Sequence, residues 1–173
     1  MKPQTILRQA VRPDGTGAAV YSTCGRYRLS LTRDWGPGRA AVFVMLNPST
    51  ASEATDDPTI ARCTGFARAL GAGGMEVVNL FAFRATHPRD LRRAEDPVGP
   101  DNDAAILSAA ARAGWLICAW GIHGTLHGRG TEVAALLRAA GHRPQVLGLT
   151  KDGHPRHPLY LRRDVQPVDW IAT

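Results

Sequence analysis

The sequence predicts an α/β fold, namely a three-layer sandwich with a central, mostly parallel sheet of about four strands and one antiparallel strand nearer the N-terminus. Four short apolar runs lead to this prediction. A run that has no alternating polar residues and ends in turn residues is typical of a strand buried on both faces. Helical patterns separate the runs, and this alternation indicates a parallel sheet with right-handed crossovers. The runs span residues 42–46, 75–83, 115–120 and 145–149.

The residues before the first run supply the antiparallel strand. Residues 27–32, YRLSLT, alternate between apolar and polar side chains as a half-exposed strand does. The turn residues 34–38, DWGPG, follow, so we expect this strand to pair antiparallel with the first apolar run. Residues 1–20 are interpreted as a loose N-terminal arm. The whole chain, 1–173, is then a single α/β domain with its core in residues 21–165.

Helix signals occupy the segments between the apolar runs. Asp57 followed by Pro58 is a typical helix start, because a capping side chain precedes a proline in the first turn. Apolar residues then recur at three- and four-residue spacing as far as Leu70, and Gly71 ends the pattern. Further helices are expected over residues 88–93, 101–113 and 131–140.

The chain is basic, with a formal net charge of +6 over its 173 residues. Only Lys2 and Lys151 are lysines, so arginine carries almost all of the positive charge. Arginine suits bidentate contacts with phosphate, which makes a nucleic acid or a nucleotide a candidate partner. A GC-rich genome favours arginine codons whatever the function, and this second explanation stays open.

The sequence contains no sign of a membrane or metal partner. No apolar run approaches the roughly 18 residues of a membrane span, and the N-terminus lacks an apolar core of signal-peptide length, so we expect a cytoplasmic protein. The cysteines have no zinc, iron–sulfur or disulfide spacing, and Cys63 and Cys118 are expected in the core. His123 and His127 have ligand-like spacing, but no carboxylate or cysteine accompanies them. We expect no metal and no cofactor.

Unusual polar residues lie at or just beyond the ends of the apolar runs. Because the carboxyl ends of parallel strands lie on one side of a sheet, we expect these residues to meet in one crevice, where ligands bind in α/β folds. For the first run, a plain Asn-Pro-Ser turn that only reverses the chain is the alternative. The residues are Asn47, Pro48, Ser49, Asn79, Trp120, Gly121, His123 and the segment His154–Pro158.

Asn79 is the hardest of these residues to explain by structure alone. It lies in VVNLF, and a buried carboxamide without donor and acceptor partners costs about 2–7 kcal/mol. Backbone groups in the core could satisfy it. Otherwise its carboxamide forms hydrogen bonds with the edge of a ligand that carries both a carbonyl and an N–H group, as a nucleobase does.

Two further residues are candidates for chemistry. His154 lies between Gly153 and Pro155 in a loop, where it is either a plain surface residue or a donor to developing negative charge. Asp56 is a candidate general base or water-orienting group, whereas capping a helix is a sufficient role for Asp57.

Taken in order, these motifs resemble the uracil-DNA glycosylase superfamily. There, an Asn-Pro or Asp-Pro motif ends one strand, a second strand carries Asn, a third ends in Gly, often Trp-Gly, and a His-Pro loop follows. The corresponding segments here are 45–49, MLNPS, 78–81, VNLF, 118–121, CAWG, and 153–156, GHPR. A longer set of segments in this chain is also similar to an uncharacterised bacterial domain family; the segments include MLNPSTA, VVNLFAFRAT and DPVGPDND.

The resemblance implies a uracil-DNA-glycosylase-like fold and a role for each matched residue. Asn47 would orient the attacking water, Asn79 would read the Watson–Crick edge of an extruded base, and His154 would stabilise the departing base as an anion. The family needs an aromatic floor on which the base stacks. Phe66 and Phe81 are candidates for that floor, although strand alternation could place Phe81 in the core instead.

The same resemblance implies contacts with the DNA backbone. Pro48 and Ser49 would approach it, and Arg156 would lie against a phosphate. The family often has glycine at the position of Ser49, whose Cβ narrows the approach, and it has a Ser-Pro wedge where this chain has Arg156-His157-Pro158.

The sequence therefore predicts a domain that binds a nucleobase or nucleic acid, with metal-independent hydrolysis of an N-glycosidic bond as its candidate reaction. Two alternatives stay open. One is a non-catalytic nucleic-acid or nucleotide binding module. The other is a hydrolase or transferase that acts on a small nucleotide or modified nucleoside. The oligomeric state is not predicted.

Overall fold

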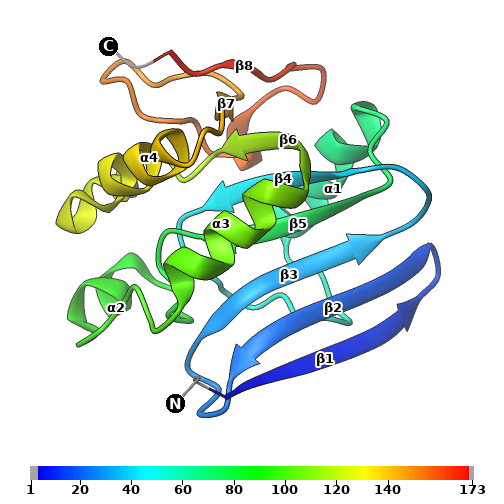
Figure 1. Cartoon of the computed structure of the whole chain (residues 1–173), viewed down its shortest axis with the longest axis horizontal. Coiled ribbons are helices and arrows are strands. Elements are labelled where there is room, and N and C mark those ends of the chain that lie inside the picture. The colour runs from blue at the N-terminus through cyan, green and yellow to red at the C-terminus, as the bar shows by residue number, and fades with distance from the viewer. Residues whose placement is uncertain (1–3, 172–173) are drawn as a thin grey trace.

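An eight-stranded mixed sheet forms the centre of the computed structural model, which describes residues 4–171 (Figure 1). Its strands are β1 (Thr5–Arg12), β2 (Gly15–Ser22), β3 (Arg28–Asp34), β4 (Ala40–Met45), β5 (Gly74–Asn79), β6 (Ala113–Cys118), β7 (Gln145–Val146) and β8 (Val168–Asp169). They lie in the order β1-β2-β3-β5-β4-β6-β7-β8. Four neighbouring pairs are antiparallel, and the three pairs within β5-β4-β6-β7 are parallel.

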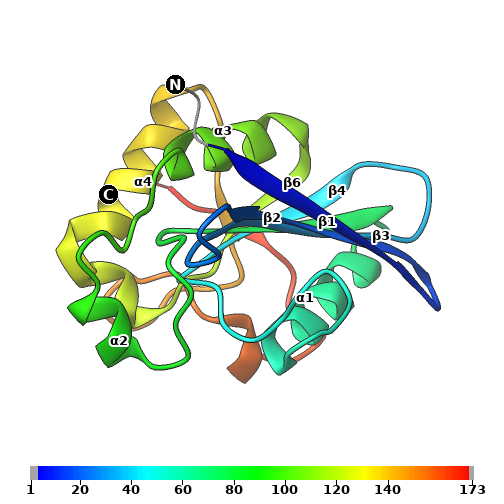
Figure 2. The same cartoon turned by 90° about the horizontal axis from the view of Figure 1, so that it is seen from below.

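Helices lie on both faces of this sheet. They are α1 (Pro58–Ala69), α2 (Pro88–Arg93), α3 (Asn102–Arg112) and α4 (Arg129–Ala139), with 3-10 turns η1 (Ile122–Gly128) and η2 (Pro158–Tyr160). Figure 2 shows α1 on one face and α3 and α4 on the other. The crossover from β4 to β5 and that from β5 to β6 run in opposite directions across the sheet. Because crossovers between parallel strands have the same handedness, this reversal puts their helices on opposite faces.

The mixed α/β fold is confirmed, and the four apolar runs form its parallel centre. The prediction of a mostly parallel sheet is wrong for the sheet as a whole, because most of its neighbouring pairs are antiparallel. Strand β4 shows why the runs lack polar alternation. Phe43 and Met45 pack into the core on the α1 face, while Val42 and Val44 pack into the core on the α3 and α4 face. None of the helices in residues 4–171 is long and apolar enough to cross a membrane.

The prediction of a loose arm over residues 1–20 is wrong for the described part of that segment. Strands β1 and β2 form an antiparallel hairpin along the edge of the sheet. Most of β1 is solvent-exposed, so it has no buried face that a sequence pattern could reveal. Gly15 closes the turn with φ +152, and a Cβ there would lie 1.9 Å from the carbonyl oxygen of Asp34.

The predicted partner of the antiparallel strand is also wrong. Strand β3 forms as expected but pairs with β5 rather than with β4. Both edges of β4 are already occupied by its parallel neighbours β5 and β6. The outer edge of β5 is therefore the position left for β3, and the sheet is larger than predicted because the hairpin and β8 extend it on opposite sides.

Candidate functional site

A cavity of about 600 Å³ lies at the carboxyl ends of β4, β5 and β6. The crossover from β4 runs to β5, and the next one runs from β5 back past β4 to β6. Such a reversal of direction opens a crevice beyond the strand ends of an α/β sheet. Helix α1 and turn η2 close the cavity, since Asp57, Thr59 and Ile60 of the α1 start and His157, Leu159 and Tyr160 at η2 also line it.

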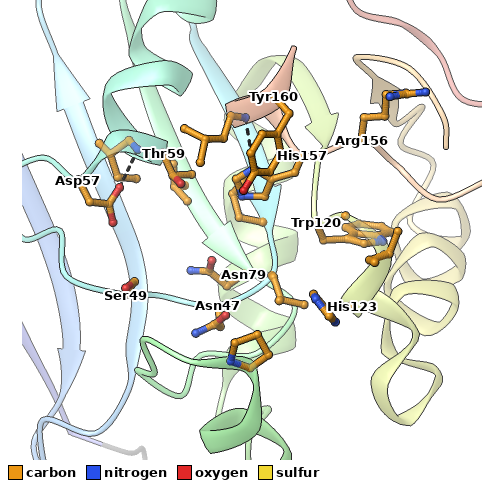
Figure 3. A pocket seen from close by; sticks show the side chains of 18 of the residues that line it. Asn47, Ser49, Asp57, Thr59, Asn79, Trp120, His123, Arg156, His157 and Tyr160 are labelled. Atoms are coloured by element: carbon orange, nitrogen blue, oxygen red, sulfur yellow. Dashed lines mark hydrogen bonds between the residues drawn. The ribbon is translucent and has the colours of Figure 1, made fainter.

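Most of the predicted site residues meet at this cavity. Figure 3 shows the two asparagines close together, with Asp57 on one side and Trp120 and His123 on the other. The side chain of Arg156 is directed away from the asparagines, and its Nε donates to the carbonyl of Leu149 at 3.0 Å. The predicted residues that line the cavity are Asn47, Ser49, Asn79, Trp120, Gly121, His123 and Arg156.

The predicted aromatic floor and one backbone contact lie elsewhere. Phe66 is buried in the core under α1, and Phe81 is buried in the core on the opposite face of the sheet. Pro48 is buried behind the lining, where its carbonyl accepts from the amide of Ala85 at 3.0 Å. Trp120 and Tyr160 are aromatic residues that do line the cavity.

Asp56 does not line the cavity, so its predicted role as a general base is not supported by its position. Its Oδ1 accepts from Nε and Nη2 of Arg33 at 3.0 and 2.8 Å, and its Oδ2 accepts from Arg12 at 3.0 Å. Two guanidinium partners make this carboxylate a structural anchor for the loop that leads into α1. The neighbouring Asp57 lines the cavity and caps α1 by accepting from the amide of Ile60 at 2.9 Å.

Of the two His-Pro steps in residues 154–158, it is the histidine of the second, rather than that of the first, that reaches the cavity. His154 is absent from the lining, and its backbone closes a turn with Thr150, whose amide donates to the carbonyl of His154 at 2.8 Å. His157 lies on the cavity wall at the start of η2. The two histidines are three residues apart, so a sequence motif could not choose between them.

The ring of His157 is held in one tautomer. Its Nδ1 accepts a hydrogen bond from the amide of Leu159 at 3.2 Å, so the ring proton lies on Nε2. Burial lowers the pKa of His157 below its ordinary value of 6.5, and the charge of Asp57 partly offsets this. A neutral imidazole with a fixed Nε2–H donor at neutral pH is the result.

The lowered pKa of His157 predicts a loss of stability in acid. As pH falls, the unfolded chain protonates His157 before the folded protein does, so the unfolded state binds more protons and the free energy of unfolding decreases. We expect urea unfolding between about pH 7 and about pH 5 to show a steeper loss for the wild type than for His157→Gln. Equal slopes for the two proteins would contradict the shift.

Asn79 is the last residue of β5 and is 1% exposed. Its main chain is fixed by a neighbouring side chain, because Nδ2 of Asn102 donates to the carbonyls of Asn79 and Leu80 at 2.9 and 3.0 Å. Within residues 4–171, neither Nδ2 nor Oδ1 of the Asn79 side chain has a hydrogen-bond partner. A rigid strand end thus presents an unpaired carboxamide to the cavity.

Asn47 is anchored through its donor group. Its Nδ2 donates to the carbonyls of Pro48 and Ala85 at 3.0 and 2.8 Å. This arrangement fixes the side-chain plane and leaves Oδ1 as an acceptor for a water or a ligand hydroxyl. Gly121, at φ +75, lies three residues beyond the end of β6. Its amide donates to the carbonyl of Pro155 at 2.9 Å, which joins the segment after β6 to the His-Pro loop.

Arg28, Asp57, Thr59 and Tyr160 line the cavity but were not predicted as site residues, and His157 was predicted there only as part of the segment 154–158, with no role of its own. The sequence did draw attention to two of them, Asp57 as a helix cap and His157 as the histidine of a second His-Pro step. Arg28 is the first residue of β3 and carried none, since a charged residue in an alternating strand is expected to face solvent. Among residues 4–171, no three His, Cys, Asp or Glu side chains are grouped as a metal site requires.

Comparison with known proteins gives one finding. The family model described as "Protein of unknown function (DUF1643)" matches residues 26–159, which is more than half of the chain. Neither the curated proteins nor the solved structures contain a match. The matched segment begins before β3 and ends within η2, so it includes all the residues that line the cavity except Tyr160 and Leu161.

Proposed function

The chain belongs to this family of unknown function, DUF1643, and from its own cavity we propose that it binds a nucleobase, as part of a nucleic acid or a nucleotide, through the side chain of Asn79. The unpaired carboxamide of Asn79 is the observation that supports this proposal. A buried amide without partners costs about 1–3 kcal/mol per group, which a ligand with a matching edge recovers. Nucleobases present an N–H donor beside a carbonyl or ring-nitrogen acceptor, and a carboxamide pairs with both.

The size and lining of the cavity agree with such a ligand. Its volume of about 600 Å³ lies within the roughly 300–1,000 Å³ typical of small-molecule sites. Trp120 and Tyr160 provide ring faces in the lining, and base–aromatic stacking contributes about 1–3 kcal/mol per base. Exposed arginines on α2, which begins at the cavity residue Pro88, provide phosphate contacts for a polynucleotide; they are Arg89, Arg92 and Arg93.

Replacing Asn79 with aspartate tests this proposal. An ionised carboxylate only accepts hydrogen bonds. A base that pairs with both groups of Asn79 would therefore lose the hydrogen bond to its acceptor atom, and the carboxylate would repel that atom. We expect Asn79→Asp to bind free bases and nucleosides about 10- to 100-fold more weakly, measured by calorimetry across the natural bases. The matched control is Gln166→Glu, which makes the same amide-to-acid change on an exposed loop. Unchanged affinity in Asn79→Asp would remove Asn79 from the binding site.

A second candidate function is hydrolysis of an N-glycosidic bond, which the geometry of His157 favours. Oδ1 of Asn47 would orient a water toward the sugar C1′, and the bond between C1′ and the base nitrogen would break with its electron pair passing to the base. The water oxygen would bond to C1′, and the proton that this water loses would neutralise the base anion. The Nε2–H of His157 would donate to the anion that forms. The proposed reaction is that of the uracil-DNA glycosylase superfamily, whose motif order this chain resembles, but with His157 in the role that the resemblance gave to His154.

Binding without turnover separates the remaining alternatives. A non-catalytic module would bind oligonucleotides with an affinity that falls by orders of magnitude as salt rises, and it would release no base. An enzyme for small nucleotides or modified nucleosides would turn over free nucleosides or nucleotides and have little affinity for polynucleotides. Incubating the protein with uracil-, hypoxanthine- and alkylated-base oligonucleotides, and separately with the corresponding nucleosides, assigns the class.

A further inference from the structure

Arg28 is a guanidinium that the protein buries without an ion partner. It is 2% exposed and lines the cavity. Its Nη1 donates to the carbonyl of Ala51 at 2.9 Å. Its Nε is buried and makes no hydrogen bond in the described chain, and no carboxylate of residues 4–171 lies within ion-pair distance. Burial lowers the pKa of Arg28 to about 10, so the side chain still carries its charge at neutral pH.

The other two buried arginines of the described chain provide an internal comparison. Arg33 pairs with Asp56 through Nε and Nη2 and also donates to four carbonyls. Arg129 pairs with Asp103 and Glu132 and donates to the carbonyl of Leu80. Burying a charge is costly unless it is paired, and both of these arginines follow that rule. Arg28 departs from it, at the wall of the cavity.

The free edge of Arg28 has a definite shape. Nη1 is occupied by the carbonyl of Ala51. Nε is buried without an acceptor within residues 4–171, and Nη2 makes no hydrogen bond in the same described chain. Nε and Nη2 form the edge that Arg33 uses for its carboxylate. Two parallel N–H donors at this edge match two oxygens of a carboxylate or phosphate group. The other charged groups at the cavity are Asp57, whose Oδ1 caps α1, and Arg156, whose Nε binds the carbonyl of Leu149.

We propose that Arg28 forms an anion subsite in this cavity and that the ligand presents a pair of oxyanion oxygens to its Nε and Nη2 edge. The subsite shares the cavity with Asn79. On the proposed function, one ligand satisfies both side chains, and it is a base that carries its own oxyanion. The oxyanion is either a carboxylate on the ring or the phosphate of a nucleotide.

Matched pairs of ligands test the subsite by calorimetry. The pairs are a nucleoside against its 5′-monophosphate, and a pyrimidine against its ring carboxylate, with inorganic phosphate as a probe that has no base. We expect one charged member to bind wild type about 10- to 100-fold more tightly than its neutral counterpart, and inorganic phosphate to bind saturably. The pair that shows the preference identifies the source of the oxyanion.

Variants decide whether Arg28 is responsible. Arg28→Met should abolish both the charge preference and the binding of inorganic phosphate. Arg28→Lys keeps the charge without the two parallel N–H donors of a guanidinium, and it should retain only part of the charge preference and of the phosphate binding. This variant also tests the proposal if Arg28→Met does not fold. Arg39→Met, an equal loss of charge at the exposed position directly before β4, should retain both the charge preference and the binding of inorganic phosphate. Equal binding of charged and neutral ligands to wild type, or a preference that persists in Arg28→Met, would overturn the proposal.

The outcomes also separate this inference from the proposed function. Phosphate binding that depends on Arg28, in a protein that binds no base, would support the subsite and contradict the nucleobase proposal. Binding of neutral nucleosides that depends on Asn79 but shows no preference for charged ligands would do the reverse.

Discussion

Replacing His157 with alanine is expected to lower the rate constant for N-glycosidic cleavage about 10²- to 10³-fold, which corresponds to about 3–4 kcal/mol of transition-state stabilisation. In the proposed reaction, Nε2–H of His157 would donate to charge that develops only as the bond breaks, so its loss should lower kcat and leave KM nearly unchanged. Single-turnover release of base from the substrate identified by the excision assay measures this constant.

The neighbouring His-Pro step provides the control. His154→Ala removes the same side chain three residues away, and we expect it to retain the wild-type rate because His154 does not line the cavity. His157→Asn keeps an N–H donor on a shorter side chain and should recover part of the rate. A rate that falls in His154→Ala and not in His157→Ala would reverse the assignment of the two histidines.

Arg33→Met is expected to decrease the free energy of unfolding by about 3–5 kcal/mol, because it removes one partner of a part-buried ion pair together with the hydrogen bonds of a charged donor to four carbonyls. Arg33 is 4% exposed, and its guanidinium donates to both Asp56 and the carbonyls of Ser52, Glu53 and Thr55. These contacts hold the loop between β4 and α1. Denaturant unfolding monitored by circular dichroism measures the loss.

Arg28→Met is the matched control for this prediction. It removes the same type of side chain from an equally buried position, but one that has a single hydrogen bond and no ion pair in the described chain. We expect it to cost much less stability than Arg33→Met. Equal losses for the two variants would indicate that Arg28 is a structural residue rather than a ligand contact.

The same loop links stability to the site. Asp57, which follows Asp56 directly, caps α1 and lines the cavity. When Arg33 no longer holds the loop, the start of α1 loses its support. Arg33→Met should therefore also weaken base binding, although Arg33 does not line the cavity.

The sequence by itself determined the parallel centre of the sheet and the start of α1. The runs that became β4, β5 and β6 are apolar without alternation because each is buried on both faces, so local composition carries the information. Asp57-Pro58 predicted the start of α1 because a cap depends on neighbouring residues only. Polar residues at these strand ends then predicted a shared crevice that Asn47, Asn79 and Trp120 do line.

Only the tertiary structure decided which residues complete the cavity and how the sheet is extended. Strand β1 has no buried face, and the position of β3 depends on which edges of the sheet are free. His154 and His157 stand in similar local sequences, yet only the latter packs beside α1 and faces the cavity. Arg28 has the sequence pattern of a surface residue in an alternating strand, but the tertiary structure buries it against the loop that contains Ala51. Burial and pairing depend on contacts between distant segments, and a local pattern cannot encode them.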